Sequence, residues 1–283
     1  MSHARRSDLR RMQRRAAGFA LLCLTMGGAS PGQPHPASPA AELLVAIEDA
    51  ADLWSRVDGT GFANDVVIAA FRAAHVPIRL TVVPYARCKQ LVLEGAVVAC
   101  ASMSRDRTSS SMVRFPSVPL FVCYTELLEN SAKPLNSTKL SALARGTRVG
   151  VVLGYEYPAA LDTALRAGNI SVERAPSELI LMRKLAAGRV DAALMNLNDI
   201  KSLAYISAAT GLTAKMLSRG RVGTLESYLG FSLRHPQSAG AMSAFEAGMR
   251  TIRANGELAA ISGKWTDTSF AVIRGSVSRG RGG

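Results

Sequence analysis

Short apolar runs alternate with stretches of helical periodicity along the chain from Leu43 onward. Residues 43–47 form a continuous apolar run, which is the pattern of a strand covered on both faces. A helix follows from about residue 64 and ends before Pro77, because the residue before a proline disfavours the helical conformation. The alternation continues with a strand over 78–83, a helix over 85–94 and a strand over 97–101. This βαβαβ order predicts a parallel sheet with right-handed crossovers.

A second α/β series follows in the next part of the chain. Its expected elements are a strand over 147–153, helices over 158–167 and 177–187, and a strand over 190–195, before a last helix over 239–254. Two extended segments, 121–125 and 228–232, join the two series. We therefore expect an α/β fold of two lobes with two hinge strands. Lobe 1 would comprise 42–122 and 228–268, lobe 2 would comprise 123–227, and the cleft between them would be the ligand site.

The two ends of the chain differ from this body in composition. Six arginines, an eleven-residue charge-free apolar run and three small residues succeed one another within residues 1–29. This layout is typical of a secretory signal peptide, because the apolar run is about half of the ~20 residues that a membrane-spanning helix needs. A Pro- and Ser-rich flexible leader over 30–41 and a Gly-, Ser- and Arg-rich disordered tail over 269–283 are also expected. Export predicts a periplasmic location.

The formal net charge of +13 is concentrated at the ends of the chain. Six arginines against Asp8 lie in the predicted signal peptide, and three more arginines lie in the last ten residues. Basic and acidic residues are interspersed in the body, which favours the approach of anions without reading a sequence. Because no zinc-finger spacing, RNA-binding aromatic motif or clustered basic helix accompanies the charge, no nucleic-acid partner is expected.

Removal of the signal peptide would leave three cysteines, Cys88, Cys100 and Cys123. Cys88 is expected early on a helix and Cys100 late on the strand that follows, so a helix folding back on its strand can bring them close. A disulfide between these two and a pair of buried free thiols are both consistent with the sequence. The four histidines form no Cys/His pair at ligand spacing, so neither a metal nor another cofactor is expected.

Several short motifs in a fixed order give the strongest indication of function. They are Gly61-Phe62 with Asp65, Val83-Pro84-Tyr85-Ala86-Arg87, Ser102-Met103-Ser104 with Phe115-Pro116, Gly146-Thr147-Arg148-Val149-Gly150, Gly188-Arg189-Val190-Asp191 and Tyr228-Leu229-Gly230-Phe231-Ser232. With these motifs, residues 42–267 resemble family 3 extracellular solute-binding proteins, which serve polar amino-acid ABC transporters. The resemblance implies a type II periplasmic binding protein fold, with a small-molecule ligand between its lobes. We expect a monomer that delivers this ligand to an inner-membrane ABC permease.

The resemblance nominates three ligand-binding positions in lobe 1. Trp54 lies in the loop after the first strand, where the family places an aromatic against the ligand; an ordinary packed aromatic is the alternative. Ser102 and Ser104 leave the third strand, where family members present hydroxyl and backbone groups to a ligand carboxylate. A serine-rich loop without a binding role is the alternative for both serines.

An arginine is expected to clamp the ligand carboxylate, because a guanidinium offers two parallel donors to two oxygens. Arg107 is the candidate, although the resemblance places the family's arginine at Ser109, so a two-residue shift is required. Arg105 and Arg114 are rivals, and each can instead be a solvated surface charge. Arg87 is a further candidate for the cleft, with an exposed helix position as its alternative.

In lobe 2, Gly154-Tyr155-Glu156 connects a strand to the start of a helix. Amides at a helix N-terminus favour an anion, and the resemblance implies that this turn receives the ligand carboxylate. Glu156 can instead serve only as an acid at the helix start. Asn196 stands where amino-acid binders carry an aspartate for the ligand's ammonium, and an amide carries no charge. The ligand then either lacks that amine or is bound by another acid, such as Glu156 or Asp199.

Three classes of function are consistent with these residues. Transport fits best, with a small polar or anionic solute as ligand, such as an amino acid or related carboxylate, because arginines outnumber acids around the expected pocket. An enzyme on the same fold, such as a cyclohexadienyl dehydratase, needs a positioned general acid, and Glu156 and Glu173 are the only candidates. Without a nucleophile–base pair or a metal site, we expect no enzyme. A ligand sensor is the third class, and the lack of a second membrane span in the sequence argues against a direct receptor role.

Overall fold

The structure is a computed structural model that describes residues 42–106, 109–212 and 215–280. All of them belong to one compact unit, Ala40–Gly283. The predicted signal peptide and leader lie outside the described residues, and so does Arg107. None of the described helices combines the length and the hydrophobicity needed to cross a membrane.

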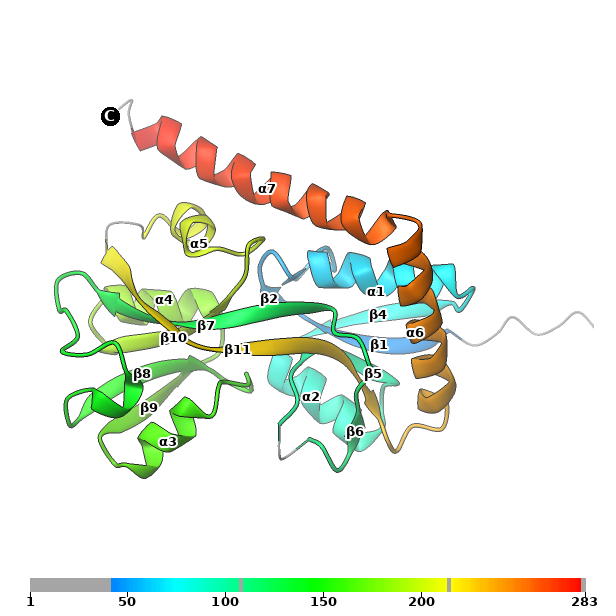
Figure 1. Ribbon diagram of the computed structural model, residues 1–283, viewed down its shortest axis with the longest axis horizontal. Helices are drawn as coiled ribbons and strands as arrows, with labels where there is room; N and C mark the ends of the chain where they lie inside the picture. Colours follow the sequence, from blue (N-terminus) through cyan, green and yellow to red (C-terminus); the bar gives the residue numbers. More distant parts are fainter. Residues whose placement is uncertain (1–41, 107–108, 213–214, 281–283) are drawn as a thin grey trace, which may run out of the picture. The chain divides into compact units, whose positions relative to one another are not determined.

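Strands and helices alternate through most of this unit (Figure 1). The strands are β1 (Leu43–Glu48), β2 (Ala50–Ala51), β3 (Ser55–Arg56), β4 (Ile78–Val83), β5 (Ala99–Met103), β6 (Val113–Arg114), β7 (Phe121–Asn130), β8 (Thr147–Val152), β9 (Ile170–Ala175), β10 (Ala192–Leu197) and β11 (Met216–Ser232). The helices are α1 (Phe62–Ala73), α2 (Tyr85–Glu94), α3 (Ala160–Arg166), α4 (Glu178–Ala186), α5 (Leu203–Thr210), α6 (Ser238–Ala254) and α7 (Glu257–Gly280), with a short 3-10 helix, η1 (Leu140–Ala142). The ends of the predicted elements differ from the observed ones by a few residues.

One mixed sheet runs through both lobes in the order β4-β1-β5-β11-β7-β10-β8-β9. In lobe 1, β1 pairs in parallel with β4 and β5; in lobe 2, β8 pairs in parallel with β9 and β10. A long antiparallel strand borders each parallel group, β11 beside β5 and β7 beside β10. The two groups with their crossover helices confirm the predicted α/β class.

The strands β7 and β11 connect the two lobes. β7 pairs with the first part of β11 as far as the Phe121–Ser227 pair. The remainder of β11, from Tyr228 to Ser232, pairs with β5 and β6 of lobe 1. Both segments that the sequence predicted as hinges are therefore extended strands, and residues beside them lie between the lobes.

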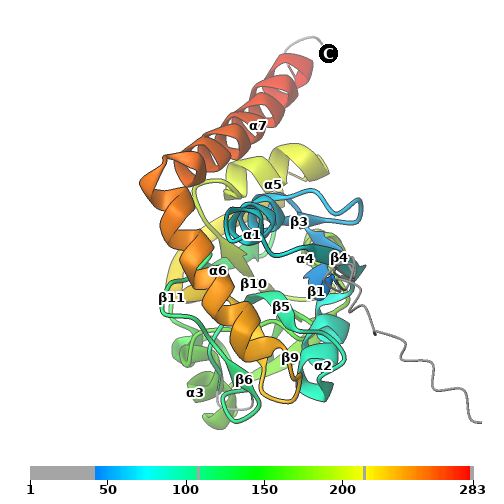
Figure 2. The same cartoon turned by 90° about the vertical axis from the view of Figure 1, so that its right-hand side faces the viewer.

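Helices α1 and α6 pack closely against each other in lobe 1 (Figure 2). A Cβ atom on Gly248 of α6 would lie 1.8 Å from the carbonyl oxygen of Ala70 in α1, so only glycine permits this approach. The rings of Phe71 and Phe245 meet nearby, with centroids 5.7 Å apart. This contact fixes the C-terminal helices onto the lobe that carries β1.

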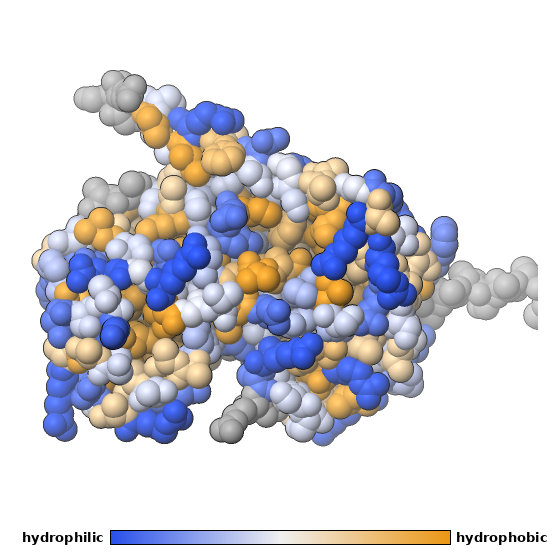
Figure 3. Space-filling view, in the orientation of Figure 1, coloured by the Kyte–Doolittle hydropathy of each residue, from blue (hydrophilic) through white to orange (hydrophobic). Residues whose placement is uncertain are grey.

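Charges of both signs are distributed over the surface. On the face shown in Figure 3, hydrophilic residues surround small groups of apolar ones. Several surface charges pair with each other, for example Arg148 with Asp191 at 2.8 Å and Lys264 with Asp65 at 2.8 Å. Such exposed pairs contribute little to stability individually. They show that some basic residues of the surface face an acid of the same chain.

The C-terminal helix α7 corrects the expected disordered tail over 269–283, because the helix continues to Gly280. Trp265 and Ser269 are buried, and Val272 and Ile273 pack against the main core. Their spacing places them on one face of a helix, and this spacing outweighs the Gly- and Ser-rich composition. Figures 1 and 2 both show α7 leaving α6 and passing beside α5 of lobe 2.

Candidate functional site

A small cavity of about 20 Å³ lies between the two lobes. Most of its lining residues stand at or just beyond the carboxyl ends of β1, β5, β8 and β10, where open α/β sheets bind ligands. The structure brings six of the predicted site residues together here: Trp54, Ser102, Ser104, Tyr155, Glu156 and Asn196. Glu48, Tyr85, Cys123 and Ser227 complete the lining.

A larger groove of about 380 Å³ lies between α1 and α7. Its charged side chains already pair with each other, Lys264 with Asp65 and Arg72 with Glu257. The groove therefore presents no unpaired charge to a ligand. The cavity between the lobes contains a buried polar group without a partner, the Ser102 hydroxyl, so we place the candidate site there.

Ser102, at the end of β5, has an unusual backbone and an unpaired hydroxyl. Its φ angle is +64°, in the left-handed region that residues other than glycine rarely adopt. Its buried Oγ has no hydrogen-bond partner among the described residues. Tyr85 Oη lies 3.3 Å from the carbonyl oxygen of Ser102. Such strain and unsatisfied polarity are typical of ligand sites.

The turn after β8 brings lobe 2 into contact with α2 of lobe 1. Gly154 has a φ of +87°, and a Cβ on it would lie 3.1 Å from Cα of Ala86. Lys89 Nζ donates to the Gly154 carbonyl oxygen at 3.2 Å. The ring of Tyr155 meets the ring of Tyr85 edge-on, with centroids 5.1 Å apart. The glycine is therefore required both for the turn and for the close approach of the lobes.

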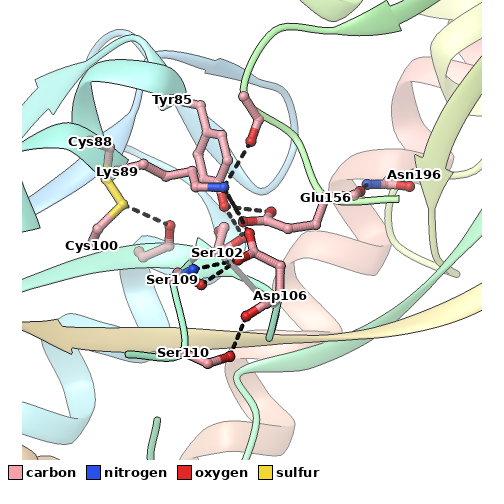
Figure 4. Close-up of polar contacts among 12 residues, drawn as sticks. Tyr85, Cys88, Lys89, Cys100, Ser102, Asp106, Ser109, Ser110, Glu156 and Asn196 are labelled. Carbon is pink, nitrogen blue, oxygen red and sulfur yellow. Dashed lines mark hydrogen bonds and ion pairs between the residues drawn. A yellow bond between two sulfur atoms is a disulfide. The ribbon is translucent and has the colours of Figure 1, made fainter. Parts of the chain in front are cut away.

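Glu156 reaches across the cavity and binds two groups of lobe 1 (Figure 4). Tyr85 Oη donates to its Oε2 at 2.8 Å, and Lys89 Nζ lies 2.8 Å from its Oε1. Burial raises the pKa of Glu156, although Lys89 and Tyr85 act in the opposite direction. Burial lowers the pKa of Lys89, but Glu156 and Asp106 outweigh it and the net shift is upward. The two charges therefore stabilise each other as an ion pair between the lobes.

Asp106 anchors the loop that follows β5 to the same lysine. Its carboxylate lies 3.2 Å from Lys89 Nζ. It also accepts hydrogen bonds from the backbone amide of Ser109 at 2.6 Å and from its Oγ at 2.8 Å (Figure 4). Ser109, the position that the resemblance gave to the clamping arginine, is thus part of a local turn.

Glu48, at the carboxyl end of β1, is the second buried carboxyl group of the cavity. Among the described residues, the Glu48 carboxyl group accepts a hydrogen bond from the hydroxyl of Tyr155. The same hydroxyl lies 3.4 Å from the carboxyl group of Glu178. Burial and the nearby Glu178 carboxylate raise the pKa of Glu48 to about 8, and the opposing effects of Tyr155 and Lys201 are smaller. Among the described residues, no basic side chain forms an ion pair with Glu48.

Lys201 of lobe 2 is completely buried beside this carboxyl pair. Its Nζ lies 2.6 Å from Glu178 and 3.4 Å above the ring centroid of Trp54. Trp54 also donates from its indole Nε1 to Asn198 Oδ1 at 3.1 Å. Trp54 therefore contacts lobe 2 through both its ring face and its N–H, in addition to lining the cavity.

Asn196 lines the cavity, but both ends of its amide are bonded to the protein. Its Oδ1 accepts from the Thr125 hydroxyl at 2.6 Å, and its Nδ2 donates to the Glu156 carbonyl oxygen at 3.2 Å. The side chain thereby holds the turn after β8 against the hinge strand β7. Asp199, the alternative acid, is not part of the lining.

The predicted arginines are not brought to the cavity in the part of the chain that the structure describes. Arg87 is exposed and lies 3.8 Å from Glu94. Arg105 stacks on the Tyr228 ring at 4.7 Å and donates to the Pro116 carbonyl oxygen, and Arg114 lines a separate surface pocket. The expected excess of arginine around the pocket is absent from the described lining, which carries two carboxyl groups instead.

Cys88 of α2 and Cys100 of β5 form a disulfide (Figure 4). Of the two alternatives that the sequence left open, the structure therefore has the bonded one. Cys123 is a buried free thiol whose pKa is raised to about 12 by burial. It lines the cavity in its neutral form and is therefore a poor nucleophile.

Sequence reasoning missed the charged groups that organise the site, namely Glu48, Lys89, Glu178 and Lys201. Glu48 carried one usable signal, because it ends the apolar run of the first strand at the edge where ligands bind. Lys89 and Glu178 look like ordinary polar positions on helices. Lys201 lies in a polar loop, and nothing in the sequence indicates that it is buried.

Comparisons with known proteins identify the fold. No protein-family model matches the chain, and no curated protein matches it by sequence. Solved structures match it well, among them a histidine kinase sensor domain with similarity to periplasmic binding proteins. That match has 16% identity and a TM-score of 0.68, and covers 79% of this chain and 95% of the sensor domain.

Two ligand-binding proteins show the same similarity. The arginine-, lysine-, histidine-binding protein ArtJ from Geobacillus stearothermophilus matches with 15% identity and a TM-score of 0.65, over 80% of this chain and 95% of that one. The ligand-binding core of GluR0 from Nostoc punctiforme, in complex with L-glutamate, matches with 19% identity and a TM-score of 0.62. The match covers 79% of this chain and 98% of the GluR0 core. The chain thus has the two-lobed periplasmic binding protein fold that the sequence predicted.

Proposed function

We propose that this chain is the periplasmic substrate-binding component of an ABC importer and captures a small polar solute between its lobes. The observation that carries the proposal is Ser102, whose buried hydroxyl has no partner among the described residues and whose backbone is strained. Because both lobes line the cavity at Ser102, a bound solute would contact both and favour their closure. The predicted signal peptide supports export.

The size and polarity of the ligand follow from the fold and from the cavity lining. The similar proteins bind arginine, lysine, histidine or glutamate, which supports a solute of amino-acid size. A cavity of about 20 Å³ holds roughly one water molecule. A solute of amino-acid size can therefore enter only if the lobes separate. Binding would then couple to closure of the monomer about β7 and β11.

Binding without catalysis is part of the same proposal. The carboxyl group of Glu156 is engaged by Lys89 and Tyr85, so it is not held ready to protonate a leaving group. Glu173, the other candidate acid, lies on β9 and is absent from the described lining of the cavity. A ligand sensor is the second candidate function, favoured by the similarity to a histidine kinase sensor domain.

A thermal-shift screen of amino acids, amines and carboxylates on the periplasmic protein tests the proposal. We expect at least one solute to raise the melting temperature and to be recovered unchanged by mass spectrometry. Ser102→Ala should weaken binding of that solute tenfold or more, whereas Ser243→Ala on the exposed side of α6 should leave it unchanged. Conversion of the solute would show an enzyme. Uptake that persists after deletion of the gene would favour a sensor.

A further inference from the structure

We propose that the solute is a small organic cation, a primary amine or guanidinium compound that lacks an α-carboxylate. This inference rests on the proposed function, because it names the class of ligand for the same cavity. It is carried by the way in which the buried charges of the site are paired.

The buried carboxyl groups at the cavity outnumber the lysines that face them. Lys89 lies 2.8 Å from Glu156, and Lys201 lies 2.6 Å from Glu178. Glu48 is equally buried, with 5% of its surface exposed, and has no such lysine or arginine in the described chain. The positive charge that would complete the set has to come from outside the protein or from a proton.

The Tyr155 hydroxyl does not remove this need. A hydroxyl has one proton to donate, and Tyr155 lies between the carboxyl groups of Glu48 and Glu178. A buried carboxylate with a single neutral donor remains costly until a cation pairs with it. The raised pKa of Glu48, about 8, reflects the same deficit, and a cationic ligand would take the place of the proton.

The groups that would receive a ligand carboxylate are already occupied. The turn after β8 was the expected carboxylate site, but its own Glu156 side chain lies there and binds Lys89 and Tyr85. A second carboxylate beside Glu156 would be repelled, and this repulsion would select against α-amino acids. The described lining contains no arginine that would offset it.

The anchor for an α-amine is also in use. Asn196 binds Thr125 and the Glu156 backbone with the two ends of its amide, and it carries no charge. Among the described residues, neither end of an α-amino-acid backbone therefore has an oppositely charged partner at the turn after β8 or at Asn196. By contrast, an ammonium group is about the size of the one water molecule that the cavity can hold. Glu48 and the unpaired hydroxyl of Ser102 both line that space.

Matched pairs of compounds that differ only in the carboxylate test the inference by isothermal titration calorimetry on the periplasmic protein. The pairs are agmatine with arginine, cadaverine with lysine and histamine with histidine. We expect the decarboxylated member of at least one pair to bind ten times more tightly than its amino acid. Glu48→Gln should weaken that binding tenfold or more, while Glu94→Gln on the exposed side of α2 should have no effect.

The remaining outcomes separate a failure of the cation assignment from a failure of the solute-binding function. If the amino acids, a neutral solute or an anion bind more tightly than the amines, the cation assignment is overturned and the solute-binding function stands. If no solute of any class binds, the function itself fails. Glu156→Gln provides a second variant. Removing the Glu156 charge should reduce the difference in affinity between the amine and the matching amino acid. An unchanged preference in this variant would overturn the role of Glu156 in excluding carboxylates.

Discussion

Glu156 and Glu48 are two buried carboxyl groups in one cavity, and their surroundings differ in one respect. Glu156 has a lysine at 2.8 Å and a tyrosine hydroxyl at 2.8 Å, both supplied by the opposite lobe. Glu48 has a tyrosine hydroxyl from the opposite lobe, but the nearby lysine is paired with Glu178. Glu156 therefore holds the lobes together through an ion pair. Glu48 has no ion-pair partner among the described residues.

The largest expected difference between the two concerns pH. Burial raises the pKa of Glu48 from 4.5, the value of a solvated glutamate, to about 8 in the folded protein, so the folded state binds this proton more tightly than the unfolded state between these two pH values. The free energy of unfolding of the unliganded protein should therefore decrease as the pH rises from 5 to 8, by about 4 kcal/mol at most. The groups that face Glu48 are Glu178, Tyr155, Lys201 and Asp49.

Urea denaturation at several pH values measures this dependence. Glu48→Gln should remove the larger part of the decline, and Glu94→Gln should leave it intact. A decline of equal size in Glu48→Gln would show that the effect arises elsewhere. Burial also raises the pKa of Glu178 and Glu156, so a smaller decline of the same sign should remain in the Glu48 variant.

Removing the partner of Glu156 should have the next largest effect. Lys89→Met leaves Glu156 buried without a cation, and breaking a buried ion pair in this way costs about 3 kcal/mol. The double variant Lys89→Met/Glu156→Gln should recover most of that loss, because the only carboxylate left without its lysine is then the more exposed Asp106. Lys139→Met, at an exposed position, is the matched control in the same denaturation experiment. Failure of the double variant to recover stability would contradict the assigned pair.

The smallest expected change is an increase in the free energy of unfolding, in contrast to the loss expected for Lys89→Met. Ser102→Gly relieves the left-handed backbone at φ +64° and should stabilise the unliganded protein by about 1 kcal/mol. The same change removes the unpaired hydroxyl, so ligand binding should weaken as stability increases. Ser104→Gly has no such strain to relieve and should destabilise the protein slightly. If both glycine variants lose stability, the backbone of Ser102 is not strained in solution.

The sequence predicted the α/β organisation because its signals are local. An apolar run such as 43–47, followed by helical spacing and a helix-ending Pro77, identifies strand and helix without knowledge of distant residues. The disordered tail was wrong because composition was weighed above spacing: Val272 and Ile273 continue the helical face that includes Trp265. The domain limits and the binding roles of the site residues stay predictions.

The charge of the site could not be predicted in the same way. Lys89 meets Glu156 across 67 positions of sequence, and Tyr155 meets Glu48 across 107. Which acid is neutralised depends on these distant pairings, and a carboxylate has the same sequence signature whether or not it is paired. For this reason the arginine excess that the sequence predicted around the pocket is absent from the described lining.

The disulfide between Cys88 and Cys100 joins two elements of lobe 1 that line the candidate site. It joins α2, which carries Tyr85 and Lys89, to β5, whose end carries Ser102. Such bonds form and persist in oxidising compartments and not in the reducing cytosol. A chain that has not yet been exported would therefore lack the covalent tie that keeps both partners of Glu156 beside Ser102. If the chain is exported as proposed, this part of the site would gain its covalent tie only after the chain has left the cytosol.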